Sequence, residues 1–277
     1  MADAPQPLDG PPDPDPLGIN PSIPSPARMY DYYLGGKDNY PADRAAAEEV
    51  LKKVPGARQT ALDNRRFLGR AVRYLAEAGI EQFVDIGAGL PTQDNVHQVA
   101  RRHRPADRPP HVVYVDNDPV VLAHGQALLA TDERTTVIMG DLREPEGILD
   151  HPELLRLVDW ERPVAVLFVS VLHFIGPESR PHELVARYVA RMAPGSYLVI
   201  SHAMYDPKLE DARKVYQRSS APTSTGRSPE EIQAFFDGLE LVEPGLVPIQ
   251  DWRPEPSPDW RREKTAAVVL GGIGRKP

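Results

Sequence analysis

The 277-residue sequence predicts an α/β fold, a doubly wound and mostly parallel sheet of seven strands with helices between them. Short β-branched runs alternate with helical runs through the middle of the chain, which is the pattern of parallel βαβ units. A glycine-containing turn follows the first of these runs, and acidic residues follow the second and third. Because ligands of open α/β sheets bind at the carboxyl ends of the strands, we expect these residues to share one edge.

The first part of the chain precedes the predicted sheet. Residues 1–27 are rich in Pro and Asp and have almost no apolar periodicity, so we expect a flexible leader there. Apolar residues then recur at helical spacing in 43–54 and 58–79, which predicts two helices, the second ending at Gly79. This predicts a helical region over 28–79 and a sheet domain over 80–277.

Seven apolar runs are the expected strands. They lie at 82–87, 111–116, 135–140, 163–170, 196–201, 239–242 and 265–272. Three of the intervening helices have recognisable N-terminal caps: Thr92, Asp118 with Pro119 directly after it, and Ser228 at the start of the capping-box sequence SPEE. No internal repeat interrupts this order.

Composition narrows the class of partner. The formal net charge is −8, which argues against a nucleic-acid partner and favours a small molecule. There is no cysteine, so disulfides and thiolate metal sites are excluded. No targeting segment and no apolar stretch of 18 residues is present, so we expect a cytoplasmic protein without a membrane partner. The sequence gives no indication of the oligomeric state.

The segment 83–92 carries the first candidate ligand-binding residues. An apolar strand containing Asp85 ends in a turn with Gly87 and Gly89, and a helix is expected to follow. Glycines at such a turn let the backbone approach a ligand and expose the helix N-terminus. A dinucleotide fold would place a third glycine at position 92, which is Thr92, so a nicotinamide dehydrogenase is only a minor alternative.

Acids follow the second and third predicted strands. Asp116, with Asn117 after it, stands where a carboxylate can accept both hydroxyls of a ribose, whereas Asp118 better suits a helix cap. Asp141 can accept from an exocyclic amine while the backbone N–H of Leu142 meets a ring nitrogen. The alternative for Asp141 is a loop residue in an Asx turn.

The order and spacing of these features resemble class I S-adenosylmethionine-dependent methyltransferases. The resemblance implies a Rossmann-like fold whose last strand is antiparallel, with S-adenosylmethionine as cofactor. It places the glycine turn at the amino-acid part of the cofactor, Asp116 at the ribose and Asp141 at the adenine. The sequence departs from that family at Pro91, where a third glycine is usual. The candidate cofactor-binding residues are Arg28, Asp85, Gly87, Gly89, Asp116, Asn117, Asp141 and Leu142.

A closer resemblance covers nearly the whole chain. The segments PSIPSPARMYDYYLGGKDNYPADR, DIGAGLPT, VYVDNDPVVLAHGQALL and GLELVEPGLVPIQDWRP are similar to a bacterial methyltransferase family whose substrates are largely unassigned. This resemblance is specific for the family and carries no information on the substrate.

The tyrosine-rich segment 28–40, RMYDYYLGGKDNY, is expected to act as a lid. Methyltransferases of the class that it resembles commonly fold such N-terminal segments over the cofactor. Arg28 is then expected to form a bidentate pair with the cofactor carboxylate, and Tyr33 is a candidate acceptor-binding residue. The alternative is that the tyrosines only pack this segment on the domain.

Candidates for the methyl acceptor side are fewer. His173 follows the fourth strand and is the candidate general base, with a structural histidine as the alternative. His202 and Tyr205 follow the fifth strand, and they are candidate acceptor-binding residues together with Trp252, although local hydrogen bonds and core packing are the competing roles. No metal is expected, because no acid follows the fourth strand before Glu178.

The function expected from these features is S-adenosylmethionine-dependent methyl transfer to an oxygen or nitrogen nucleophile of a small molecule, by in-line displacement. The alternative is a non-catalytic regulatory protein that binds S-adenosylmethionine or S-adenosylhomocysteine, since the cofactor half of the site is better defined in the sequence than the acceptor half.

Overall fold

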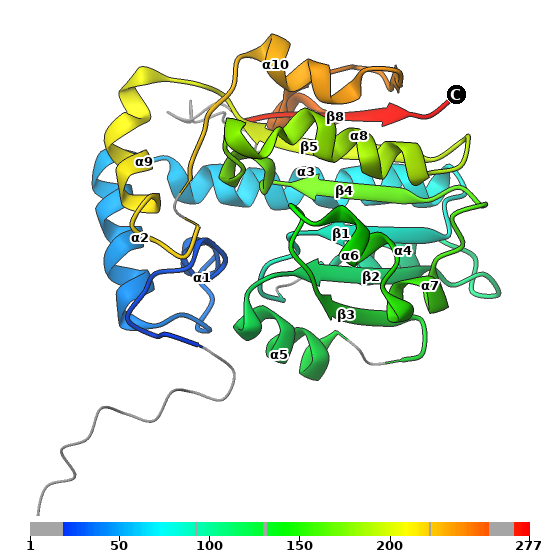
Figure 1. Ribbon diagram of the computed structural model, residues 1–277, viewed down its shortest axis with the longest axis horizontal. Coiled ribbons are helices and arrows are strands. Elements are labelled where there is room, and N and C mark those ends of the chain that lie inside the picture. Colours follow the sequence, from blue (N-terminus) through cyan, green and yellow to red (C-terminus); the bar gives the residue numbers. More distant parts are fainter. Residues whose placement is uncertain (1–18, 92–93, 130–131, 222, 255–268) are drawn as a thin grey trace, which may run out of the picture.

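The computed structural model describes residues 19–91, 94–129, 132–221, 223–254 and 269–277. Its strands form one sheet in the order β3-β2-β1-β4-β5-β8-β6, with β7 also paired to β8 (Figure 1). The strands are β1 Gln82–Ile86, β2 His111–Asp116, β3 Thr135–Met139, β4 Ala165–Val169, β5 Tyr197–Ala203, β6 Glu240–Leu241, β7 Val247–Pro248 and β8 Val269–Arg275.

The pairing confirms the predicted doubly wound, mostly parallel sheet. Strands β1 to β5 pair in parallel, and β8 lies antiparallel to β5 along seven residue pairs. One strand was not predicted: β7 has only two residues, one of them Pro248, so no strand pattern marks it in the sequence. Of the predicted last strand, 265–268 lies outside the described residues, and β8 continues to Arg275.

Helices cover the sheet and extend beyond its end. The α-helices are α1 Pro26–Tyr33, α2 Pro41–Lys53, α3 Ala57–Glu77, α4 Val96–Arg102, α5 Pro119–Leu128, α6 Pro145–Leu149, α7 Pro152–Leu157, α8 Pro181–Arg191, α9 Glu210–Tyr216 and α10 Pro229–Gln233. Short 3₁₀ turns are η1 Leu172–Phe174, η2 Pro177–Ser179, η3 Pro207–Leu209, η4 Ala234–Phe236 and η5 Ile249–Asp251.

The predicted helix ends agree with the structure where residues are described. The Asp118 carboxylate accepts from the backbone N–H of Val120 at 2.9 Å, Ser228 forms its capping box, and Gly79 follows α3 with a φ of +98°. The helix predicted from Thr92 begins at Val96 instead, after a capping box at Asn95, and Thr92 lies outside the described residues.

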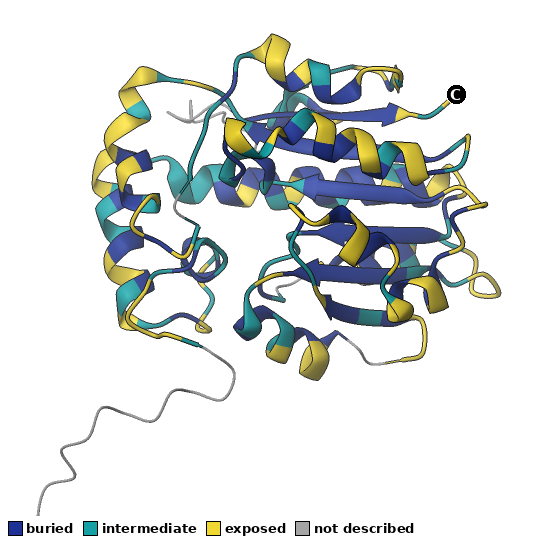
Figure 2. Ribbon diagram, viewed as in Figure 1, coloured by how far each residue is buried: buried dark blue, intermediate teal, exposed yellow. Residues whose placement is uncertain are grey.

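Two apolar layers enclose the sheet, whose central strands are buried on both faces (Figure 2). Helices α6, α7 and α8 pack on one face, and α3, α4 and α5 pack on the other. Strands buried on both faces are expected to be continuously apolar, as β4 and β5 are. Among the described residues, no helix is long and apolar enough to cross a membrane.

Helices α1, α2 and α9 form a third cluster beyond the carboxyl ends of the parallel strands (Figure 1). Its interior includes Met29, Ala47, Val50 and Val215, all buried. Helix α3 begins beside this cluster and then runs along the sheet, where Phe67 and Leu75 are fully buried. The three helices therefore stand opposite the strand ends at which the candidate site residues lie.

Candidate active site

A cavity of about 770 Å³ lies between the carboxyl ends of β1 to β5 and the helices beyond them. Ten of the predicted site residues line it: Arg28, Tyr33, Asp85, Gly87, Gly89, Asp116, Asn117, Asp141, Leu142 and His173. The predicted residues His202, Tyr205 and Trp252 are not among the described residues that line it. Cavities of ~300–1,000 Å³ are typical of small-molecule sites, so this one has room for a cofactor and a small second ligand.

The glycine turn after β1 has the backbone that the sequence predicted. Gly87 and Gly89 have φ values of +73° and +66°, which favour glycine. A Cβ atom at Gly87 would lie 2.4 Å from Cγ2 of Val171, so the turn is also pressed against the segment after β4. A Cβ atom at Gly89 would meet nothing within 4 Å, which leaves open space beside that part of the backbone. The turn therefore fits a ligand that approaches the main chain closely.

Asp116, at the end of β2, holds this turn in place. One carboxylate oxygen accepts from the backbone N–H of Gly89 at 2.8 Å, and the other accepts from that of Asp118 at 2.9 Å. Burial raises the pKa of Asp116 to about 6, although these backbone donors oppose the rise. Each carboxylate oxygen has further lone pairs, so both can still accept from a ribose hydroxyl.

Asp85 is a second buried carboxylate at the same edge. It is 5% exposed, and burial raises its pKa to about 7, with the charge of Asp116 adding to the rise and Arg65 opposing it. A buried acid with so high a pKa destabilises the folded chain when it is ionised. Such perturbed carboxylates are common at ligand-binding sites, where a cationic ligand group restores the ionised form.

We expect the D85N variant to be more stable than the wild type at pH 8. Asp85 keeps its proton in the folded state up to about pH 7 but loses it near pH 4 when unfolded, so the free energy of unfolding falls between these values. An amide removes this cost, and we expect a gain on the order of 2 kcal/mol at pH 8, or about 5 °C in Tm. Differential scanning calorimetry at pH 8 and pH 4 measures it.

The same comparison at pH 4 should show little difference, because both states then hold the proton. The exposed Asp107→Asn variant is the matched control and should change Tm at neither pH. A D85N protein that is less stable than the wild type at pH 8 would contradict the proposed ionisation.

Asp141, after β3, is engaged by its neighbour Arg143. The guanidinium forms a bidentate pair with the carboxylate, in which Nε lies 2.9 and 3.0 Å from the two oxygens. This pairing holds the pKa of Asp141 below its usual range, and Asn117 adds to the effect. The carboxylate is thus ionised and positioned at the cavity, with Arg143 beside it as a residue that sequence reasoning did not single out.

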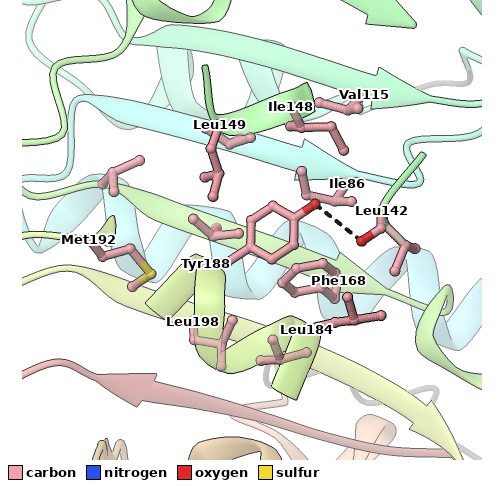
Figure 3. Packing of buried hydrophobic residues seen from close by; sticks show 14 of the residues in the cluster. Ile86, Val115, Leu142, Ile148, Leu149, Phe168, Leu184, Tyr188, Met192 and Leu198 are labelled. Carbon is pink, nitrogen blue, oxygen red and sulfur yellow. Dashed lines mark hydrogen bonds between the residues drawn. The ribbon is translucent and has the colours of Figure 1, made fainter. Parts of the chain in front are cut away.

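Leu142 is fixed by the core below the cavity (Figure 3). The hydroxyl of Tyr188, on α8, donates to the carbonyl of Leu142 at 3.4 Å, and the Leu142 side chain packs in the same cluster as Phe168. Because its carbonyl and side chain are both held, the main chain of this residue is a rigid part of the cavity wall.

Arg28, on α1, lines the cavity but is committed to protein partners. Its Nε donates to Asp43 at 2.8 Å, one terminal nitrogen donates to Asp118 at 3.2 Å, and the other donates to the carbonyl of Ile23 at 2.7 Å. Ser25 bonds the same two carboxylates. The predicted bidentate pair with a cofactor carboxylate would require Arg28 to leave these contacts, so in this structure it joins α1 to α2 and α5.

His173 lies in η1, directly after β4, where Ser170 has a φ of +57° and turns the chain. Burial lowers the pKa of His173 to about 4, and the charges of Arg227 and Arg213 lower it further. Its Nδ1 atom is buried and has no hydrogen-bond partner among the described residues. The imidazole is therefore neutral at pH 7 and only a weak base.

His202 lies within β5 rather than after it, and it does not line the cavity, although its ring contacts that of His173 at 5.7 Å between centroids. Arg227 donates to Nε2 at 2.6 Å, so Nε2 carries no proton and Nδ1 donates to the carbonyl of Ala203 at 2.8 Å. The same guanidinium donates to the carbonyls of Leu172 and Ile175 at 2.9 and 2.7 Å. The pair thus fixes the turn that carries His173, which is a supporting role.

Tyr205 and Trp252 lie outside the cavity lining as well. Tyr205 is 57% exposed and packs against the guanidinium of Arg213. Trp252 is fully buried in the apolar cluster that α3 forms with the sheet, where its ring and that of Phe67 meet edge-on at 5.7 Å between centroids. Trp252 therefore packs in the core, which was the alternative to a role in acceptor binding.

Residues remote in sequence complete the cavity wall. The Tyr33 hydroxyl lies 3.1 Å from that of Tyr216 on α9. Asn64 donates to the hydroxyl of Tyr30 at 3.0 Å and accepts from the Ser201 hydroxyl at 2.6 Å. No short motif marks Tyr216 or Asn64, so only the fold reveals them. In the described part of the chain, no group of three or more His, Asp or Glu side chains is placed to hold a metal ion.

Known proteins share both the sequence pattern and this fold. The family model for S-adenosyl methyltransferases matches residues 13–277. A solved candidate methyltransferase from Thermobifida fusca YX is 43% identical, with 92% of this chain and 96% of that chain covered and a TM-score of 0.85. A DUF574 family protein from Streptomyces avermitilis MA-4680 is 39% identical, with 92% and 98% covered and the same TM-score. A comparison with curated proteins gives no match.

Proposed function

Because the chain belongs to the S-adenosyl methyltransferase family and is an S-adenosylmethionine-dependent methyltransferase, we propose that it methylates an oxygen or nitrogen nucleophile of a small molecule. The observation that carries this proposal is the cavity itself. The cavity has a volume of about 770 Å³. The acids at the strand ends lie on one side of it, and residues of α1, α2, α9 and η1 form the opposite wall. A concave site of this size suits a small acceptor rather than a macromolecular surface.

The proposed cofactor contacts follow from the charges at the strand ends. Asp116 would accept from the ribose hydroxyls, Asp141 from the adenine amine, and the Gly87–Gly89 turn would meet the amino-acid part. The Asp85 carboxylate would be ionised when a cationic group of the cofactor lies beside it, and it would then pair with that group. When bound, S-adenosylmethionine supplies an electrophilic methyl group on a sulfonium sulfur.

The proposed role of the remaining side chains is to orient the acceptor and to exclude water. Methyl transfer from a sulfonium is an in-line displacement in which positive charge is lost, so alignment and a dry site matter more than a strong base. With a pKa of about 4, His173 is suited to positioning the nucleophile through a hydrogen bond. Methylation of an O–H or N–H nucleophile would release one proton, which would pass to bulk water because His173 is only a weak base. An acceptor whose O–H or N–H is acidic, or whose nucleophilic atom is uncharged and needs no base, therefore suits this site.

Incubation of the full-length protein with methyl-labelled S-adenosylmethionine and an unfractionated bacterial cell extract tests this proposal. We expect label in the fraction that passes an ultrafiltration membrane, because the size of the cavity suits small molecules. The wild type should transfer label at least about a hundredfold faster than D116A, since that variant lacks two charge-assisted hydrogen bonds.

Label retained with macromolecules would contradict the small-molecule acceptor. Tight cofactor binding without transfer to any fraction would instead favour the regulatory alternative. The D107N variant, altered at an exposed acid outside the cavity lining, is the control and should transfer label as the wild type does.

A further inference from the structure

An aromatic wall, formed by His173, Phe174, Tyr216 and Tyr33, runs along the side of the cavity opposite the acids. The centroids of His173 and Phe174 are 4.4 Å apart, and those of Phe174 and Tyr216 are 5.7 Å apart. The Tyr216 hydroxyl then meets that of Tyr33 at 3.1 Å. All four residues line the cavity, so the wall connects the turn after β4 to helices α9 and α1.

The two tyrosine hydroxyls have one donor to spare. They carry two protons, and the hydrogen bond between them uses one. Burial raises the pKa of Tyr33 and raises that of Tyr216 to about 12, so both hydroxyls stay protonated at neutral pH. The second proton is therefore available to an oxygen atom of a ligand that lies against the wall.

The charges around the aromatic wall disfavour a cation. Among the described residues that line the cavity, the acids are Asp85, Asp116, Asp118 and Asp141, and all four belong to β1 to β3 or the turns after them. On the other side, Arg213 and Arg227 lower the pKa of His173, which means that they also oppose any other positive charge placed beside it. Val50, Val54, Ala57 and Ala61 add apolar lining.

We propose that the methyl acceptor is an uncharged aromatic small molecule bearing a hydroxyl group, bound with its ring against Phe174 and Tyr216 and its oxygen at the Tyr33–Tyr216 pair. The inference rests on the proposed function, because it names the substrate class for the same site. Aromatic rings gain from edge and offset contacts with Phe and Tyr beyond their burial, and the spare phenol proton matches a hydroxyl oxygen. A protonated amine on the same ring is disfavoured, because no carboxylate among the described lining residues lies on this side of the cavity.

Calorimetric titration of the full-length protein, first saturated with S-adenosylhomocysteine, tests the charge preference. We expect 2-naphthol to bind at least about tenfold more tightly than 2-naphthylmethylamine, which is protonated at neutral pH and differs chiefly in that charge. Equal or tighter binding of the amine would overturn the proposal. If S-adenosylhomocysteine itself does not bind, the proposed function fails, so the two failures are distinguishable.

Two variants locate the binding site. Y216F keeps the ring but removes one hydroxyl, and F174L removes a ring, and each should weaken 2-naphthol binding about fivefold or more while S-adenosylhomocysteine binding stays within about twofold. Y205F, which alters an exposed tyrosine outside the cavity lining, is the matched control and should bind as the wild type does. If Y216F does not fold, Y33F removes the other hydroxyl of the same pair. Unchanged 2-naphthol binding in the folded variants would refute the assignment.

Discussion

Replacing Asp116 with alanine is expected to weaken S-adenosylmethionine binding by about a hundredfold or more. The carboxylate is proposed to accept two ribose hydroxyls, and hydrogen bonds to a charged group contribute ~1.5–3 kcal/mol each. It also holds the glycine turn through the N–H of Gly89 and the start of α5 through that of Asp118. The variant therefore loses direct contacts and a positioned loop together. Isothermal titration calorimetry at pH 7.5 measures the loss.

The pH dependence of the wild type provides a second measurement of the same carboxylate. Because the pKa of Asp116 is raised to about 6 in the free protein, affinity should fall as the pH is lowered through that value. D116A should show a smaller fall over the same range. Unchanged affinity in D116A, with normal circular dichroism, would refute the site assignment.

The largest expected effect on stability comes from Asp43, a residue with no proposed contact to any ligand. Its carboxylate is fully buried and accepts from the N–H groups of Ser25 and Tyr40 at 2.8 and 2.7 Å and from Nε of Arg28 at 2.8 Å. The D43A variant leaves these donors unpaired around a buried guanidinium. Removing one partner of a buried ion pair typically costs ~3–5 kcal/mol, and urea unfolding should report a loss of that size.

Two further variants distinguish the effect of the Asp43–Arg28 ion pair from a general effect of changing helix α2. Glu49, on the same helix α2, pairs with Arg218 at the surface, so E49A should cost at most ~1 kcal/mol. The double variant D43A/R28M should lose less than the sum of its single changes, because the buried Nε–H that donated to Asp43 is then absent as well. Additive losses would show that Asp43 and Arg28 act independently.

The sequence predicted which residues meet at the strand-end side of the cavity, the proposed cofactor site, because parallel strands bring their carboxyl ends to one edge. Once the strands were identified, Gly87, Asp116 and Asp141 had to lie near one another, whatever the details of the helices. Asp118 was predicted as a helix cap from Pro119 alone, since that signal is local. These predictions depend on chain order and on neighbours a few residues apart.

The acceptor half could not be predicted in the same way. His202 was placed in the cavity on the expectation that β5 ended at Ser201, but the strand continues to Ala203, and Arg227 holds the His202 ring behind that of His173. Arg28 was expected to face a ligand, yet its carboxylate partners stand 15 and 90 residues away. Tyr216 joins Tyr33 across 183 residues, a separation at which no sequence pattern carries information.

The hydrogen-bond chain from Tyr30 through Asn64 and Ser201 bears on how ligands enter. It reaches the backbone N–H of Ser170, which donates to the Ser201 hydroxyl at 2.9 Å, so α1 and α3 are tied to the carboxyl ends of β4 and β5. A hinge between these helices and the sheet would break buried polar contacts. The segment 19–25 is tied in the same way: Ser25 bonds Asp43 and Asp118, the carbonyl of Ile23 accepts from Arg28, and the carbonyl of Pro24 accepts from the N–H of Ser220. Ligands are therefore expected to exchange without a rotation of α1 and α3 away from the sheet.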